Sequence, residues 1–344
     1  MLAGACGGGS SDIERAVSAA NGVLEAVDAA SEDHDSLAYL ARIDAVLLAS
    51  ELGGSEQSLT QRLDTLWDAR YTTESGRPGW GLPYAWDAFR DGTTNPVDTI
   101  YTYTTAMAAL AFLDGYVALE DRVQLERAKE AVSTILLDCW GFVDGSLKSV
   151  WYSDQPQDQL GESYVVHNVN ALTLAALARI ARYEERAYEP DKRRGIEEML
   201  VQHSGYQGVD GQWQYQIGRQ NRNDLVHHSY IALGLVEAGL PEAETAIRYM
   251  WSEWFDNSSG AFDASNGEVM GSTAWGPGDA LLPLTAAADW RPQARLLTDQ
   301  LLAMVGDSGI PSVADRDEPR SVVRYGLGPA LYAARAVGAK GLFP

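Results

Sequence analysis

Three of the five histidines in the chain lie at two matching places in the sequence. His167 stands in Val166–Asn170, and His227 and His228 stand in the similar stretch Val226–Tyr230. An imidazole titrates near neutral pH, so it can act as an acid, a base or a hydrogen-bond donor to a carboxylate. A tyrosine hydroxyl can serve in the same way. We therefore predict that Tyr103, His167, His228 and Tyr230 are catalytic residues.

The spacing of Asp224 and His228 adds a second feature to this pattern. Asp224 lies one helical turn before His228, where its carboxylate could orient the imidazole ring. His167, His228 and Asp224 could alternatively provide three ligands for a zinc ion. Adjacent His227 and His228, however, point about 100° apart on a helix and rarely reach one ion. We favour acid–base chemistry and expect neither a metal nor another cofactor.

Aromatic residues suggest what would bind near these groups. The chain has ten Trp and sixteen Tyr but only six Phe. Trp and Tyr combine an apolar face with a polar edge, and carbohydrate sites need flat faces for sugar rings with polar groups around them. The alternative is that these aromatics brace the loops against each other. The predicted substrate-binding residues are Trp80, Tyr101, Tyr152, Asn168, Trp213, Tyr215, Arg222, Asp224 and Arg324.

Helical periodicity dominates the chain from Asp12 onward and must position these residues. One helix of each consecutive pair has a charged outer face, whereas the other, such as 106–113, is rich in Ala and Leu nearly all round. Helices of the second kind are buried. The expected helices are 12–30, 34–52, 56–71, 96–118, 120–138, 163–183, 188–203, 224–239, 241–256, 278–288, 291–305 and 322–338.

Six buried inner helices surrounded by six outer ones describe an all-α fold, the α/α toroid, in a single domain over residues 12–344. A superhelical solenoid is the competing arrangement. Aromatic loops precede the inner helices, so polar groups should gather at one mouth of the ring. Asp87, Asp91, Asp98, Asp154, Asp224 and Asp279 would also lie there. Paired carboxylates suit glycoside hydrolysis, although Asp in such loops commonly makes turns and caps.

Charge restricts the partners of the protein. The 26 Lys and Arg residues against 48 Asp and Glu give a formal net charge of −22. Binding to a nucleic-acid backbone needs a basic face that releases counterions, so nucleic acid is excluded as the main partner. No run of 18 apolar residues is present, so no segment reads as a membrane-spanning helix.

The N-terminal segment has a different character. Small residues precede Cys6, and a Gly/Ser run follows it up to Ser11. This resembles the end of a bacterial lipoprotein signal, although the large aliphatic residue Leu2 lies one position too early. The resemblance implies that residues 1–11 form a flexible tether lipidated at Cys6, attached to a membrane in the cell envelope. A Gly-rich tail of a cytoplasmic protein is the alternative.

The segments 80–103, 151–170 and 213–235 together resemble the bacterial glucuronyl 5-epimerase-like family of α/α-toroid proteins. The resemblance covers about the middle half of the chain and implies action on a uronic-acid-containing polysaccharide or oligosaccharide, with Tyr as acid and base. Removing the proton at carbon 5 requires donors such as Asn168, Arg222 or Arg324 on the sugar carboxylate. Epimerisation or elimination would follow. A glycoside hydrolase of this fold and a non-catalytic glycan-binding envelope lipoprotein remain the alternatives.

Overall fold

The structure, a computed structural model, describes residues 56–82, 85, 94–97, 99–145, 147–154, 165–184, 186–203, 211–217, 223–256, 261–262 and 275–304. The predicted helices 12–30, 34–52 and 322–338 lie outside these ranges, as do the tether with Cys6 and the predicted binding residues Arg222 and Arg324. No helix in the described part of the chain is long and apolar enough to cross a membrane.

The described helices agree closely with the expected periodicity. They are α3 (Glu56–Asp68), α4 (Thr102–Leu119), α5 (Arg122–Asp138), α6 (His167–Ala181), α7 (Pro190–Glu198), α8 (Leu225–Ala238), α9 (Glu242–Trp254), α10 (Trp275–Ala286) and α11 (Arg291–Met304). A π-helical turn, Met199–His203, extends α7.

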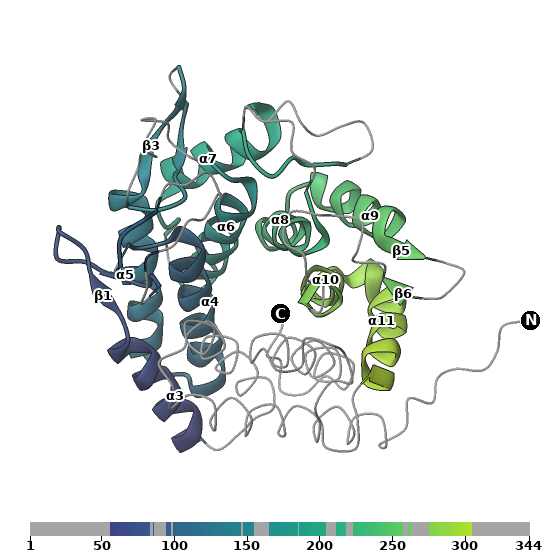
Figure 1. The fold of residues 1–344 in the computed structure, drawn as a ribbon. Helices are drawn as coiled ribbons and strands as arrows, with labels where there is room; N and C mark the ends of the chain where they lie inside the picture. The colour runs from purple at the N-terminus through teal and green to yellow at the C-terminus, as the bar shows by residue number, and fades with distance from the viewer. Residues whose placement is uncertain are drawn as a thin grey trace, which may run out of the picture.

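These helices form two concentric layers (Figure 1). The inner helices α4, α6, α8 and α10 contact one another in that order, and α3, α5, α7, α9 and α11 lie outside them. Each inner helix also packs on the outer helix that follows it in sequence. The predicted α/α toroid is therefore confirmed.

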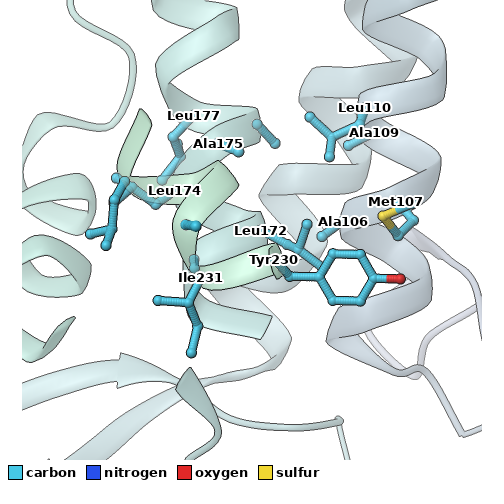
Figure 2. Packing of buried hydrophobic residues seen from close by; sticks show 14 of the residues in the cluster. Ala106, Met107, Ala109, Leu110, Leu172, Leu174, Ala175, Leu177, Tyr230 and Ile231 are labelled. Atoms are coloured by element: carbon cyan, nitrogen blue, oxygen red, sulfur yellow. The ribbon is translucent and has the colours of Figure 1, made fainter. Parts of the chain in front are cut away.

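Small side chains allow the inner helices to approach closely. Ala106, Ala109 and Ala175 are buried between α4, α6 and α8, together with larger residues such as Leu172 and Leu177 (Figure 2). Helix α8 lies close against α6. A Cβ atom on Gly234 would lie 2.3 Å from the Ala171 carbonyl oxygen, which is far inside van der Waals contact.

Gly234→Ala should therefore destabilise the protein. The added methyl group meets backbone rather than a mobile side chain, so α6 and α8 must move apart. Overpacking of this kind typically costs about 1–3 kcal/mol. Denaturant unfolding monitored by circular dichroism measures the loss. An unchanged free energy of unfolding would show that these two helices can separate without cost.

Among the described residues, three short hairpins that the periodicity does not predict follow outer helices. They pair β1 (Tyr71–Thr72) with β2 (Pro78–Gly79), β3 (Trp140–Asp144) with β4 (Leu147–Val150), and β5 (Phe255–Asp256) with β6 (Ala261–Phe262). Each hairpin leads the chain from an outer helix toward the next inner one.

The loop after β4 fixes the start of α4. The Thr102 N–H donates to the Tyr152 carbonyl at 3.0 Å, and the Asp154 N–H donates to the Ile100 carbonyl at 3.0 Å. Tyr101 forms an isolated bridge with Ser153. Because residues just before Thr102 are extended and paired, the expected helix 96–118 begins only at Thr102.

Candidate active site

A chain of three polar side chains joins three inner helices. The Tyr103 and Tyr230 hydroxyl oxygens lie 3.1 Å apart, and the Tyr230 hydroxyl donates to Asp279 Oδ2 at 3.1 Å. Tyr103 is in the first turn of α4, Tyr230 in the second turn of α8, and Asp279 in the second turn of α10. The N-terminal ends of these helices therefore meet at one end of the toroid, as the sequence pattern predicts.

The three groups differ in exposure. Tyr230 and Asp279 are buried, with 1% and 0% of their surface exposed, whereas Tyr103 is only partly buried. Figure 2 shows the Tyr230 ring extending from α8 toward Ala106 and Met107 of α4. Of these three hydrogen-bonded side chains, Tyr103 is therefore the one that a ligand could contact. The sequence does not single out Asp279 among the six acidic residues expected at this end; its signal is its place near the start of an inner helix.

His228 lies on the opposite side of α8 from Tyr230. The two residues are two positions apart, which turns their side chains by about 200° on a helix. The His228 ring is fully buried, and its Nε2 atom lies 2.9 Å from the Ala246 carbonyl oxygen of α9. It packs among the rings of Trp213, Tyr249 and Trp254. The structure therefore assigns His228 to the contact between α8 and α9, and not to acid–base chemistry.

Asp224 holds His227 and not His228, contrary to our prediction. The carboxylate caps α8 by accepting from the His227 backbone N–H at 2.8 Å. Its two oxygens also lie 2.7 and 2.8 Å from His227 Nδ1. Burial disfavours the charged form of Asp224, but the attraction and hydrogen bonds of His227 outweigh it and lower the pKa of this carboxyl. Because Asp224 is the N-cap, the third residue of the helix is the one it reaches.

His167 is buried at the start of α6. Its Nδ1 atom lies 2.7 Å from the Gln214 carbonyl oxygen, and its backbone N–H donates to the Tyr215 carbonyl at 3.1 Å. Burial lowers the pKa of His167 to about 4, although these hydrogen bonds oppose the shift. His167 therefore stays neutral near pH 7 and joins the 211–217 segment to α6. These contacts give His167 a positioning role, and its catalytic role stays a prediction.

The indole rings of Trp80 and Trp213 are in the core and do not face a ligand. Both residues have 0% of their surface exposed. The Trp80 Nε1–H donates to the Leu66 carbonyl at 2.9 Å, and the Trp213 Nε1–H donates to the Leu200 carbonyl at 3.1 Å. These bonds favour the alternative interpretation, in which Trp80 and Trp213 brace the loops against the end of the preceding outer segment.

Other predicted binding residues remain at the mouth. Tyr101 and Tyr152 pack edge to face, with ring centroids 5.6 Å apart, and Tyr152 is the more exposed of the two. Tyr215 packs edge to face on His227 with centroids 4.8 Å apart. Burial raises the pKa of the Tyr215 hydroxyl.

Asn168 occupies on α6 the place that Tyr103 occupies on α4. Each is the second residue of its helix, and both helices begin with the same backbone bond from the first residue to a loop tyrosine. Its side chain should therefore extend in the same direction relative to the ring. Asn168 is 4% exposed, and its Oδ1 atom is buried without a hydrogen-bond partner among the described residues.

The carboxyl of Asp154 is partly buried near Tyr101 and Tyr152. It accepts from the Ile100 backbone N–H at 3.0 Å. Burial raises the pKa of Asp154 to about 6, and the hydrogen bond from Ile100 acts in the other direction. Within the described ranges, no group of three His, Cys, Asp or Glu residues could hold a metal ion.

Asp154→Asn should change how stability depends on pH. The folded pKa of about 6 lies above the usual 3.8, so native Asp154 retains a proton that the unfolded chain loses. Ionising the buried carboxyl therefore lowers the stability of the wild type as pH rises from about 4 to about 6. Asn keeps an acceptor for Ile100 without ionising, so the variant should gain stability relative to the wild type across this window. A stability difference that stays constant in denaturant unfolding at several pH values would contradict this.

No model of a known protein family matches the sequence, and no curated protein matches it. Several solved structures resemble it. A family 76 α-mannanase of Bacteroides thetaiotaomicron has a TM-score of 0.64 at 14% identity, covering 87% of each chain. A family 76 glycoside hydrolase (mannosidase) of the same bacterium has a TM-score of 0.63 at 11% identity, covering 96% of this chain and 99% of the other.

A third similar structure has another activity. The cellobiose 2-epimerase of Bacillus thermoamylovorans has a TM-score of 0.58 at 13% identity, covering 86% of this chain and 87% of the other. At such low identity these likenesses concern the backbone arrangement alone. The chain therefore has the α/α-toroid fold that mannanases and sugar epimerases also have.

Proposed function

We propose that the protein is a carbohydrate-active enzyme with Tyr103, Tyr230 and Asp279 as its acid–base centre. The observation that carries the proposal is the hydrogen-bonded chain of two hydroxyls and a carboxylate, built from three inner helices at one end of the ring. Support for a saccharide substrate comes from the fold shared with mannanases and sugar epimerases and from the aromatic rings beside this chain.

The direction of the hydrogen bonds defines a proton path. The Tyr230 hydroxyl donates its proton to Asp279, so the Tyr103 hydroxyl is the donor in its hydrogen bond to Tyr230. A proton leaving the substrate would bond to Tyr103 oxygen while the Tyr103 proton moves to Tyr230 and the Tyr230 proton moves to Asp279. The reverse sequence returns a proton.

The reaction that we propose is proton removal at carbon 5 of a uronic acid unit in a polysaccharide. The electron pair of the broken C–H bond would move onto the adjacent carboxylate, which needs hydrogen-bond donors at that moment. The amide of Asn168 is one candidate donor within the described residues. Return of a proton to the opposite face gives the epimer, whereas loss of the substituent at carbon 4 gives an unsaturated end. Both outcomes use the same first step.

Glycoside hydrolysis is the second candidate. It is favoured by the fold shared with family 76 enzymes and by Asp154, whose pKa of about 6 would suit a general acid. A hydrolase would use two carboxylates, so its activity should survive loss of the Tyr103 hydroxyl. A glycan-binding protein without turnover is the third candidate.

One experiment separates these candidates. The protein is incubated with polyuronates and, in parallel, with mannans in deuterated water. Deuterium at carbon 5 without chain cleavage supports epimerisation, and absorbance from unsaturated ends supports elimination. New reducing ends without unsaturation would support hydrolysis. Binding without any of these products would leave a glycan-binding protein and contradict the proposed chemistry.

Membrane attachment through Cys6 also remains a proposal, supported by the small residues before Cys6 and the Gly/Ser run after it. An acylated protein should fractionate with membranes, and Cys6→Ser should release it. A wild-type protein that fractionates with soluble proteins and carries no acyl group would contradict the proposal and favour the cytoplasm.

A further inference from the structure

A second polar cluster lies beside the Tyr103–Tyr230–Asp279 chain, at the start of α8. It is centred on His227, whose Nδ1 atom contacts both carboxylate oxygens of Asp224 at 2.7 and 2.8 Å. His227 lies three residues before Tyr230, and residues at that spacing are neighbours on one face of a helix. The cluster therefore faces the same end of the ring as the acid–base chain.

The partner of His227 fixes how its ring can bind a ligand. The lowered pKa of Asp224 means that this carboxyl is ionised, and an ionised carboxylate can only accept hydrogen bonds. Nδ1 therefore donates to Asp224, and Nε2 is the ring nitrogen left for a ligand. The Tyr215 ring packs edge to face on His227 and restricts its rotation. The side chain of His227 is 14% exposed, so a ligand can approach it.

Two buried amides at the starts of α8 and α6 have polar atoms without partners in the described part of the chain. Asn223, directly before the N-cap Asp224, is 5% exposed, and neither its Oδ1 nor its Nδ2 atom has a hydrogen-bond partner within the described part of the chain. The same holds for Oδ1 of Asn168, next to His167 on α6. Leaving a buried polar group unpaired typically costs about 1–3 kcal/mol, so such groups call for an explanation.

We propose that His227, Asn223 and Asn168 form a saccharide subsite that recognises hydroxyl groups of a sugar unit at the acid–base chain. This inference rests on the proposed function and extends it. Asn223 leaves an amide oxygen and an amide N–H unpartnered, and a sugar hydroxyl can donate to the first and accept from the second. Oδ1 of Asn168 is a further acceptor for an O–H group. The subsite would therefore hold the hydroxyl side of the sugar, whether or not the sugar also carries an acid group.

Binding measured without turnover tests the subsite. Tyr103→Phe serves as the parent protein because it should bind substrate without converting it. Calorimetric titrations use two probes, a mannose tetrasaccharide and a hexuronate tetrasaccharide. His227→Phe in this parent keeps a ring against Tyr215 but removes both ring nitrogens, and it should weaken binding of the bound probe about tenfold, as loss of one hydrogen bond does. Asn223→Ala should have a similar effect.

The controls make the outcomes distinct. Arg248→Gln, an exposed change on α9, should leave affinity unchanged, and thermal melting verifies that each variant is folded. Unchanged affinity in both folded subsite variants would overturn the subsite while leaving the proposed function intact. A hexuronate that binds more tightly in acid only when His227 is present would overturn the hydroxyl assignment in favour of a carboxylate. Binding of neither probe would contradict the proposed function itself.

Discussion

Tyr103→Phe should lower turnover by about 10²–10⁴-fold while leaving the melting temperature nearly unchanged. The substitution removes only the hydroxyl that a substrate would meet, and loss of a positioned acid or base has effects of this size. Tyr103 is partly exposed, so its hydroxyl contributes little to the core. Tyr230→Phe should also lower turnover, because it interrupts the path from Tyr103 to Asp279. It should cost more stability, since it leaves the buried Asp279 without this donor.

Tyr188→Phe is the matched control for this prediction. It removes a tyrosine hydroxyl that donates to the Lys129 carbonyl on the outer side of the ring. Its turnover should equal that of the wild type. Initial rates on the substrate identified by the deuterium experiment, combined with thermal melting, measure both effects. Full activity of Tyr103→Phe would remove the acid–base chain from the mechanism and favour a pair of carboxylates.

Helical periodicity was sufficient to predict the double-layered architecture. The all-apolar segments became inner helices, and the segments with one charged face became outer helices, because burial depends mainly on how polar residues are distributed around each helix. The hairpins were missed because their strands are short. The boundary of α4 was misplaced because Ile100 and Tyr101 are fixed by pairing with a loop that is distant in sequence.

Part of the site could also be predicted from how polar residues are distributed along each helix. Sequence position was sufficient to place Tyr103, Tyr230 and Asn168 near the mouth, since each lies in the first or second turn of an inner helix. Sequence position could not decide in which direction the side chains of neighbouring residues extend. His228 and Tyr230 are two positions apart and face opposite sides of α8, which places one against α9 and the other inside the ring.

The indole rings raised a similar ambiguity. A tryptophan in a Gly-rich loop can stack on a sugar or close the core beneath the loop, and composition does not distinguish the two. In Trp80 and Trp213 the indole N–H reaches a carbonyl at the end of the preceding outer segment, 14 and 13 residues earlier. The repetition of this bond identifies it as a structural element of the helix pair.

The two buried histidines should make the protein sensitive to acid. Burial lowers the pKa of both His167 and His228 to about 4, below the usual value of 6.5. Between these values the unfolded chain binds protons that the folded protein excludes, so the contribution of these two histidines to stability is full above about pH 6.5 and is lost as pH falls toward 4. A difference of about 2.5 pKa units corresponds to about 3 kcal/mol for each histidine.

Denaturant unfolding of the wild type and of His228→Gln, between about pH 7 and pH 4, tests this prediction. The Gln amide can still donate to the Ala246 carbonyl but does not titrate. The variant should be less stable than the wild type at pH 7, because Gln packs less well among the surrounding rings, and its stability should fall less steeply in acid. The two unfolding free energies should therefore converge as the pH decreases. Parallel curves would contradict this prediction, because they would mean that His228 binds a proton equally well in the folded protein and in the unfolded chain.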